Sequence, residues 1–263
     1  MTNPRPLLDD CFLHDKDRLR HHEALAILKE RVNCVAGLEN VPLEASHGRI
    51  LAEDVTAPRD VPQSDNSAVD GYAFRFSDYE AAGGFFRLER RIAAGHPSDV
   101  VLGPAGTARI FTGALMPPGA DTVAMQEDCE PHEQDGGNFV AIPPGLKPGA
   151  NRRKAGEDLN LGDEIAPKGT RIKPQLVAAF ASCGISSVSV FAPLKIALIS
   201  SGDELKEPGH DALDGEVYDS NRYLLSSLLK HLPVEITDYG IQPDNYEKIE
   251  ATLKEAAASH DII

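Results

Sequence analysis

Three common classes of protein are excluded by what this sequence lacks. Its four cysteines stand singly with no Cys-x-x-Cys spacing, which argues against a zinc site and is typical of reduced thiols in the cytosol. No apolar run approaches the roughly 20 residues that a membrane-spanning helix needs. Residues 1–17 are too charged and too interrupted by proline for a secretory signal. We therefore expect a cytoplasmic protein with no membrane partner.

Positive charge is also scarce. The 263 residues include 26 Lys and Arg against 41 Asp and Glu, which gives a formal net charge of −15. Such a chain repels polyphosphate backbones, so we expect no nucleic-acid partner. A small anionic substrate is still compatible, because local donors and metal ions act at short range. The length allows one to three domains of ordinary globular composition.

Hydrophobic periodicity predicts a helix near each end of the first 190 residues. At 19–32, Leu25, Leu28 and Val32 recur at helical spacing with charged residues between them, which predicts an amphipathic helix. A second helix is expected from Pro174, because proline suits a first turn and Gly184 suits a C-terminal stop.

The segment between about residues 55 and 150 has a different composition. Prolines and glycines recur every few residues, and β-favouring runs lie between them at 85–92, 108–111 and 122–125. Short strands separated by turn residues predict a small β-rich domain.

From Leu194 onward the pattern alternates between strand and helix. The predicted elements are a strand at 196–199, a helix at 221–231, a strand at 234–239, a helix at 244–258 and the start of a third strand at 261–263. Asp244 and Glu247 have the spacing of a capping box at the head of the last helix. This order predicts the N-terminal half of a doubly wound parallel α/β domain, with Ile263 inside the domain.

A polar segment follows the bends at Pro58 and Pro62. It reads Asp-Asn-Ser-Ala-Val-Asp-Gly-Tyr-Ala over residues 65–73, and no regular amphipathic pattern runs through it. Such a segment predicts a braced loop that presents polar groups. The alternative is an Asx-type turn whose side chains satisfy only the local backbone.

Five segments in this order resemble the MoeA family of molybdopterin molybdenumtransferases, to which the gephyrin E domain is related. They are 65–73, Ile-Phe-Thr-Gly-Ala at 110–114 followed by Pro-Gly-Ala-Asp-Thr-Val at 118–123, 153–158 ending in Gly-Glu-Asp, Ser-Gly-Asp-Glu-Leu at 201–205 and Tyr-Asp-Ser-Asn-Arg at 218–222. The resemblance covers residues 20–263. The family's next segment, Ser-Gly-Gly-Val-Ser, would follow Ile263, so the resemblance implies a chain truncated at its C-terminus.

The fold implied by the resemblance is an elongated, multi-domain α/β and β protein. Its parts would be an elongated linker and dimerisation domain at 1–54 plus 150–192, a small β-rich domain at 55–149, and an incomplete α/β molybdopterin-binding domain at 193–263. The resemblance also implies a homodimer whose active site is shared between the β-rich domain of one subunit and the α/β domain of the other.

The activity implied by the resemblance belongs to molybdenum cofactor biosynthesis. It is the Mg²⁺-dependent insertion of molybdate into adenylylated molybdopterin with release of AMP, and it allows contact with other proteins of cofactor synthesis. The alternative function is non-catalytic, as a dimerisation or scaffold module or as a binder of molybdate or pterin.

Site residues are expected from the match to the family's motifs and from their chemistry. Carboxylates hold hard cations and position water, while hydroxyls and backbone amides bind oxyanions. The expected catalytic residues are Asp70, Thr112, Asp158 and Glu204, and the expected metal ligands are Asp203 and Asp244. The expected substrate-binding residues are Asp65, Asn66, Ser67, Gly113, Arg153, Ser201, Gly202, Ser220 and Asn221.

Some of these residues have plainer alternatives. Asp70 could cap a turn, Asp158 could be a surface charge and Asp244 could cap a helix. Gly113 and Gly202 are expected to offer open backbone amides beside a hydroxyl. The basic run at 152–154 could neutralise phosphate or molybdate, or it could be an ordinary surface loop.

Overall fold

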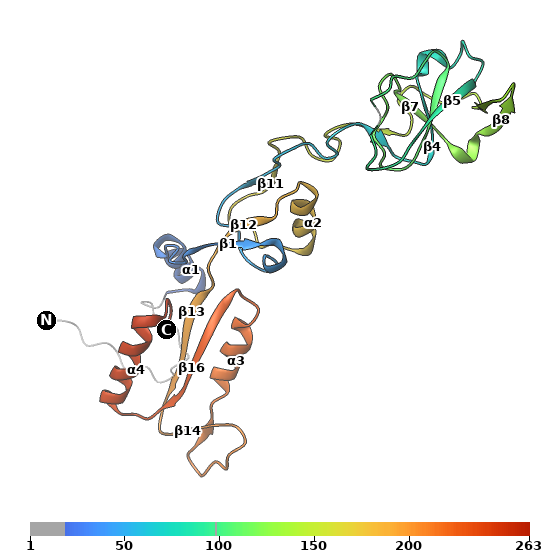
Figure 1. Cartoon of the computed structure of the whole chain (residues 1–263). Helices are drawn as coiled ribbons and strands as arrows, with labels where there is room; N and C mark the ends of the chain where they lie inside the picture. The colour runs from blue at the N-terminus through green and yellow to red at the C-terminus, as the bar shows by residue number, and fades with distance from the viewer. Residues whose placement is uncertain (1–18, 98) are drawn as a thin grey trace.

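The computed structural model of the chain describes residues 19–97 and 99–263. Residues 1–18, which include Cys11, lie outside the described part. Figure 1 shows an elongated chain in which an α/β unit, a middle unit and a β-rich unit follow one another. The prediction of an elongated, multi-domain α/β and β fold is confirmed.

The middle unit is assembled from segments that are distant in the sequence. Strands β1 and β12 pair antiparallel, as do β2 and β11, and helix α2 packs beside them. Leu51, Phe180 and Val190 are fully buried in their shared core. The bounds are β1 (Leu38–Pro42), η1 (Leu43–Ala45), β2 (Val55–Thr56), β11 (Glu164–Ala166), α2 (Pro174–Ser182) and β12 (Ser187–Phe191).

Both expected helices of the first 190 residues form. Helix α2 has Pro174 in its first turn, and Gly184 follows its end with φ of +79°, a backbone conformation that glycine adopts without strain. Helix α1 (His21–Arg31) differs from the expectation because it buries no residue. Leu28 is 55% exposed, since no described element of the chain covers this face of the helix.

The β-rich unit contains one six-stranded sheet in the order β7-β4-β6-β5-β9-β8. Only β5 and β6 run parallel within it. Phe74 and Phe86 are fully buried, with ring centroids 4.8 Å apart. The bounds are β4 (Gly71–Phe74), η2 (Phe76–Asp78), β5 (Phe85–Ile92), β6 (Gly106–Ile110), β7 (Thr122–Met125), η3 (Gln126–Asp128), β8 (Glu130–Gln134) and β9 (Gly137–Ala141).

Two antiparallel segments join the β-rich unit to the middle unit. Strand β3 (Asn66–Ser67) pairs with β10 (Arg152–Arg153), and Val61 pairs with Leu159 further along. The loop at 65–70 therefore lies beside the loop at 151–158, although more than 80 residues separate Asp65 from Arg152 in the sequence. This pairing brings two of the five family-like segments together.

The α/β unit has the predicted parallel topology. Strands β13 and β16 pair in parallel, and Ile262 makes a parallel bridge to Ile196 of β13. Figure 1 shows α3 and α4 on either side of the strand pair. No helix in the described part of the chain is long and apolar enough to cross a membrane. The bounds are β13 (Leu194–Ser201), β14 (Leu205–Lys206), β15 (Val217–Tyr218), α3 (Ser220–Leu229), β16 (Val234–Gln242) and α4 (Tyr246–Ser259).

The predicted capping box of the last helix is wrong by one residue. Helix α4 begins at Tyr246, and the N-cap is Asn245, whose side chain accepts a hydrogen bond from the Lys248 amide at 3.0 Å. Asp244 lies one position earlier, so its carboxylate is not used by this helix cap.

Candidate functional site

Asp70 and Thr112 meet at one end of two central strands of the β-rich sheet. Asp70 directly precedes β4, Thr112 follows β6, and Gly71 at the start of β4 pairs with Ile110 at the end of β6. The Oδ1 atom of Asp70 accepts hydrogen bonds from the Thr112 amide and the Thr112 hydroxyl, both at 2.8 Å. These two bonds, the backbone one foremost, hold the pKa of Asp70 below its ordinary value. Two expected catalytic residues are therefore in direct contact, with Asp70 ionised.

Gly71 permits the close approach on which this contact depends. A Cβ atom at Gly71 would lie 1.9 Å from the carbonyl oxygen of Ala124 on β7. Real Cβ atoms essentially never come so close to a backbone oxygen, so the backbone of β4 can lie here only with glycine.

Arg109 is a residue that the sequence argument missed. It lies on β6, donates from Nη1 to the Gly71 carbonyl at 2.8 Å, and places its guanidinium 4.7 Å from the ring centroid of Phe111. Its charge also contributes to the lowered pKa of Asp70. The sequence shows only that an arginine precedes Thr112 by three residues on a predicted strand. Such an arginine does not by itself indicate a partner.

The open amide expected at Gly113 is not present. Its N–H donates to the Ser67 carbonyl at 2.8 Å, and the Ser67 amide donates to the Ala114 carbonyl at 2.9 Å. Ser67 is 1% exposed, and its hydroxyl donates to the Val69 carbonyl at 2.6 Å. The loop at 65–70 uses these groups to fix its own backbone, and both residues hold the position of Thr112.

The basic run at 152–154 is largely neutralised within the chain. Arg153 donates to Asp158 at 2.6 Å and to Glu157 at 3.1 Å, and Arg152 lies 3.5 Å from a carboxylate oxygen of Asp65. Hydrogen bonds to Asp158 first, and to Glu157, raise the pKa of Arg153. The run is therefore not an open basic cluster as one interpretation expected. Of the three cationic side chains in this run, only that of Lys154 has no carboxylate partner in the described residues.

Two buried polar atoms beside this loop have no partner in the described part of the chain. They are Oδ1 of Asn66 and Nε of Arg152. A buried polar atom without a hydrogen bond costs about 1–3 kcal/mol. Asn66 thus has an acceptor that a water or a ligand could satisfy, next to Asp65, whose Oδ1 accepts from the Ala155 amide at 2.9 Å.

The other expected residues gather at the carboxyl ends of the parallel strands, where α/β sheets bind ligands. Ser201 ends β13, Asp203 follows it, and the Asp244 amide donates to Oδ1 of Asp203 at 3.1 Å. The two expected metal ligands are therefore adjacent. The amide of Gly202 is occupied, since it donates to the Gln242 carbonyl at 3.1 Å, so the expectation of an open amide there is also wrong.

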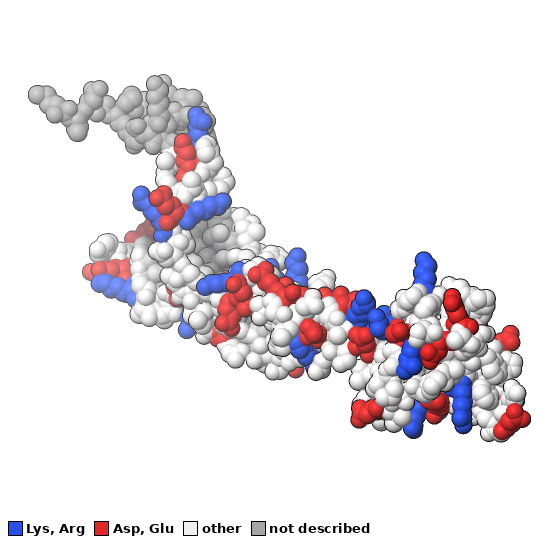
Figure 2. Space-filling model, turned by 90° about the horizontal axis from the view of Figure 1, so that it is seen from above, with Lys and Arg blue, Asp and Glu red and all other residues white. Residues whose placement is uncertain are grey.

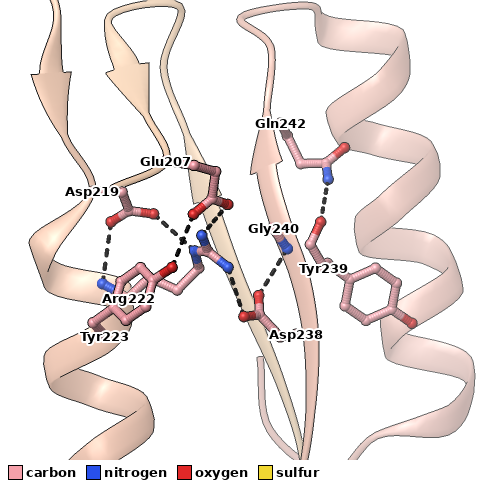
Figure 3. Close-up of polar contacts among 8 residues, drawn as sticks. All are labelled: Glu207, Asp219, Arg222, Tyr223, Asp238, Tyr239, Gly240 and Gln242. Carbon is pink, nitrogen blue, oxygen red and sulfur yellow. Dashed lines mark hydrogen bonds and ion pairs between the residues drawn. The ribbon is translucent and has the colours of Figure 1, made fainter. Parts of the chain in front are cut away.

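Ser220 and Asn221 lie in the first turn of α3. The next residue, Arg222, is the centre of an ion-pair network that the sequence did not predict. Arg222, which is 7% exposed, contacts Asp219, Asp238 and Glu207, and the hydroxyl of Tyr223 donates to Glu207. Figure 3 shows these side chains converging from three elements. Only the Asp219–Arg222 spacing at the head of a helix was visible in the sequence.

The network also shifts the pKa values of its members. Burial opposes ionisation of Asp219, but hydrogen bonds from Ser200 and Arg222 outweigh it and keep the pKa of Asp219 below its ordinary value. Burial likewise opposes the charge of Arg222, while its bonds to Asp219 and Asp238 raise the pKa of the guanidinium. The ion pairs are therefore maintained across the neutral pH range.

The two groups of expected residues are far apart in the chain. Asp70 and Thr112 belong to the β-rich unit and Asp203 and Asp244 to the α/β unit, which Figure 1 shows at opposite ends of the molecule. On the face shown in Figure 2, the described Lys and Arg side chains lie scattered between acidic ones and form no continuous basic surface. Within the described residues no three His, Cys, Asp or Glu side chains are grouped to hold a metal ion.

Most of the chain matches two known protein families. Residues 19–184 match the family described as MoeA N-terminal region (domain I and II), and residues 197–263 match one described as probable molybdopterin binding domain. The molybdopterin molybdenumtransferase of Haemophilus influenzae is 36% identical over 229 residues, covering 86% of this chain and 55% of the relative. That of Nostoc sp. is 35% identical and covers 86% and 52%.

A solved structure supports the same relationship. The molybdopterin biosynthesis MoeA protein of Pyrococcus horikoshii superposes with a TM-score of 0.80 at 32% identity, covering 92% of this chain and 64% of that one. The chain spans about half the length of the curated relatives it matches.

Proposed function

Since this chain belongs to the MoeA family, we propose that it acts in molybdenum cofactor biosynthesis as a molybdopterin molybdenumtransferase. The reaction would be the insertion of molybdate into adenylylated molybdopterin, with hydrolysis of the adenylate and release of AMP. The observation that carries the proposal is the contact between Asp70 and Thr112. It joins two of the five family-like segments, and it presents an ionised carboxylate at the exposed end of two central strands of the sheet.

The roles of the residues follow from their positions. Asp70, Thr112, Asp158 and Glu204 would position water and the reacting oxygen atoms. Lys154 would attract an anionic group of the ligand. The unpaired acceptor of Asn66 would instead accept a hydrogen bond from a donor group of the ligand or from water. We propose Asp65, Arg153, Ser201, Ser220 and Asn221 as substrate-binding residues. Ser67, Gly113 and Gly202 would support the site through the backbone contacts that occupy their polar groups.

A magnesium ion fits the pair formed by Asp203 and Asp244. Mg²⁺ is commonly held by one or two carboxylates, with waters and substrate phosphates completing its coordination. The two residues follow neighbouring parallel strands and touch through the Asp244 amide. When bound there, the ion would neutralise charge on the adenylate phosphate. The chain's own contribution is to hold the two carboxylates at the same end of the sheet.

We further propose a homodimer with a shared site. The β-rich and α/β residues cannot meet within one elongated chain (Figure 1), so one copy would supply each group. The domains would be 1–54 plus 150–192, 55–149 and 193–263. Other proteins of cofactor synthesis would be transient partners in a cytoplasmic pathway.

A non-catalytic association module is the second candidate. The observation that favours it is the apolar outer face of α3, where Leu224 and Leu228 are each 57% exposed. Large exposed apolar surfaces mark protein–protein contacts.

The Asp70→Asn variant tests the proposal. Molybdate insertion would be assayed with purified chain, adenylylated molybdopterin, molybdate and Mg²⁺, and AMP release would be measured. We expect loss of AMP release while the circular dichroism spectrum is retained. Unchanged AMP release would remove Asp70 from the mechanism. Stable self-association without any AMP release from the unaltered chain would favour the association module.

A further inference from the structure

The segment at 203–218 connects the carboxyl end of β13 to α3, and little apolar burial holds it in place. Leu213 is 72% exposed, Val217 53% and Tyr218 50%. Between residues 203 and 222, the buried residues are Asp219 and Arg222. Apolar contacts at this level of exposure contribute little to local stability, so the segment depends on polar links. Within the segment these are the β14–β15 pairing and the Lys206–Glu216 ion pair, which do not connect it to β16.

Arg222 links three carboxylates, one that caps its own helix α3, one on β16 and one in the loop after β14. Its Nε donates to Asp219 at 3.0 Å, its Nη1 donates to Asp238 at 2.6 Å, and its Nη2 donates to Glu207. Figure 3 shows the guanidinium between the three carboxylates. The planar guanidinium presents its donors in a rigid fork, so each partner is held in direction as well as distance.

Asp238 is the anchor of this network in the sheet. It lies on β16, and its second oxygen, Oδ1, accepts from the Gly240 amide at 2.8 Å. The β13–β16 pairing is shifted at this point, between Leu198 and Ser200. Asp238 is therefore fixed to the strand, and through it Arg222 is fixed to the sheet.

The other two carboxylates lie next to expected site residues. Glu207 follows Glu204 by three positions, across the short strand β14. Asp219 directly precedes Ser220 and caps α3 by accepting from the Arg222 amide at 3.2 Å. One guanidinium thus connects both sides of the expected binding region to the sheet.

We propose that Arg222 is a positioning residue of the α/β site. By binding Glu207 and Asp219 it holds Glu204 and Ser220 at the carboxyl end of β13, where the pterin substrate would bind. The inference rests on the proposed function for the identity of that substrate. The restraint on the 203–218 segment is a property of the chain alone and is tested separately.

Hydrogen–deuterium exchange of the purified chain tests the restraint. In Arg222→Gln we expect amides at 203–218 to exchange about tenfold faster, because local opening no longer breaks the ion pair between Glu207 and the buried guanidinium of Arg222. Amides of β13 and β16 should exchange at the unaltered rate. Equal exchange in the segment, or a comparable increase in both strands, would contradict a positioning role.

Glu207→Gln keeps the test valid if the Arg222 variant does not fold. It weakens the link to the segment and leaves Asp219 and Asp238 in contact with Arg222. We expect faster exchange at 207–216 and a smaller effect than in Arg222→Gln. Lys254→Gln is the control, because it removes an exposed ion pair with Glu250 on α4 of the same unit. Lys254→Gln should leave the exchange rates of the 203–218 segment and of strands β13 and β16 unchanged.

Binding of adenylylated molybdopterin tests the connection to the site. We expect Arg222→Gln to weaken binding about tenfold and Arg222→Lys to restore part of it, since lysine keeps the charge but not the fork. Equal affinity of Arg222→Gln and the unaltered chain would overturn the positioning role alone. No binding by the unaltered chain would contradict the proposed function and, with it, the role of Arg222 toward this substrate, even where the exchange results hold.

Discussion

The β-rich unit and the α/β unit present their candidate residues by different physical means. Asp70 and Thr112 lie next to the ends of strands β4 and β6. Phe74 of β4 and Val123 of the neighbouring strand β7 are fully buried. In the α/β unit the candidate residues also follow strand ends, but polar links hold the connecting segment at 203–218. These links are the short β14–β15 pairing and the ion pairs of Lys206 and Arg222.

This difference separates two ways of preorganising a site. Close packing around Gly71 leaves the β-rich unit one backbone arrangement, because the backbones of β4 and β7 are in contact there. Charge pairs tie the α/β segment at a few points and leave the chain between them free to open locally. We therefore expect the β-rich group to be rigid and the α/β group to respond to ligand.

The largest expected effect comes from the core of the β-rich unit. Phe86→Ala should lower the free energy of unfolding by about 3–5 kcal/mol, because a fully buried ring is replaced by a cavity. Urea unfolding of the purified variants measures this. Leu228→Ala on α3, which is 57% exposed, is the matched comparison and should change stability by at most about 0.5 kcal/mol. Equal losses in both variants would abolish the contrast between the two units.

A slightly smaller effect is expected at the contact between strands. Gly71→Ala should lower the free energy of unfolding by about 3 kcal/mol, because the new methyl group would overlap the Ala124 carbonyl. Gly37→Ala is the control, since its Cβ would meet only the Cβ of Ala192 at 3.8 Å, an ordinary contact. Thermal unfolding of both should show a large shift for Gly71→Ala only. A Gly71→Ala protein as stable as Gly37→Ala would mean that β4 can move.

The smallest effect is a pH dependence at Asp70. Its pKa is lowered in the folded chain, so its ionised form stabilises the fold fully above its ordinary value of 3.8, and this contribution is lost as pH falls through the lowered value. The amide introduced by Asp70→Asn cannot titrate. The difference in stability between the unaltered chain and this variant should therefore shrink between about pH 5 and pH 2 in urea unfolding. A constant difference would show that the Thr112 bonds do not favour the ionised form.

Much of the fold follows from local patterns in the sequence. Strands β5 and β7 have the bounds expected from β-favouring runs between turns, and α2 begins at the expected proline. The cap of α4 is displaced from Asp244 to Asn245 because both residue types cap helices and only the backbone angles decide between them.

The contacts that build the site could not be read in the same way. Asp70 and Thr112 are 42 residues apart, and their meeting depends on the β4–β6 register. The amide of Gly113 looks open in the sequence and is taken by Ser67 only after the loop folds. Two partners of Arg222, Glu207 and Asp238, are 15 and 16 residues away in the sequence, and no local pattern indicates such a network.

In the proposed homodimer the two groups of residues act together across two copies of the chain. Binding of adenylylated molybdopterin would be measured for Asp70→Asn, for Glu204→Gln and for an equal mixture of the two after exchange of subunits. Each variant alone should lose high-affinity sites. The mixture should recover about a quarter of them, because half of the dimers are mixed and each has one intact site of two. A mixture with no more high-affinity sites than the separate variants would contradict the shared site.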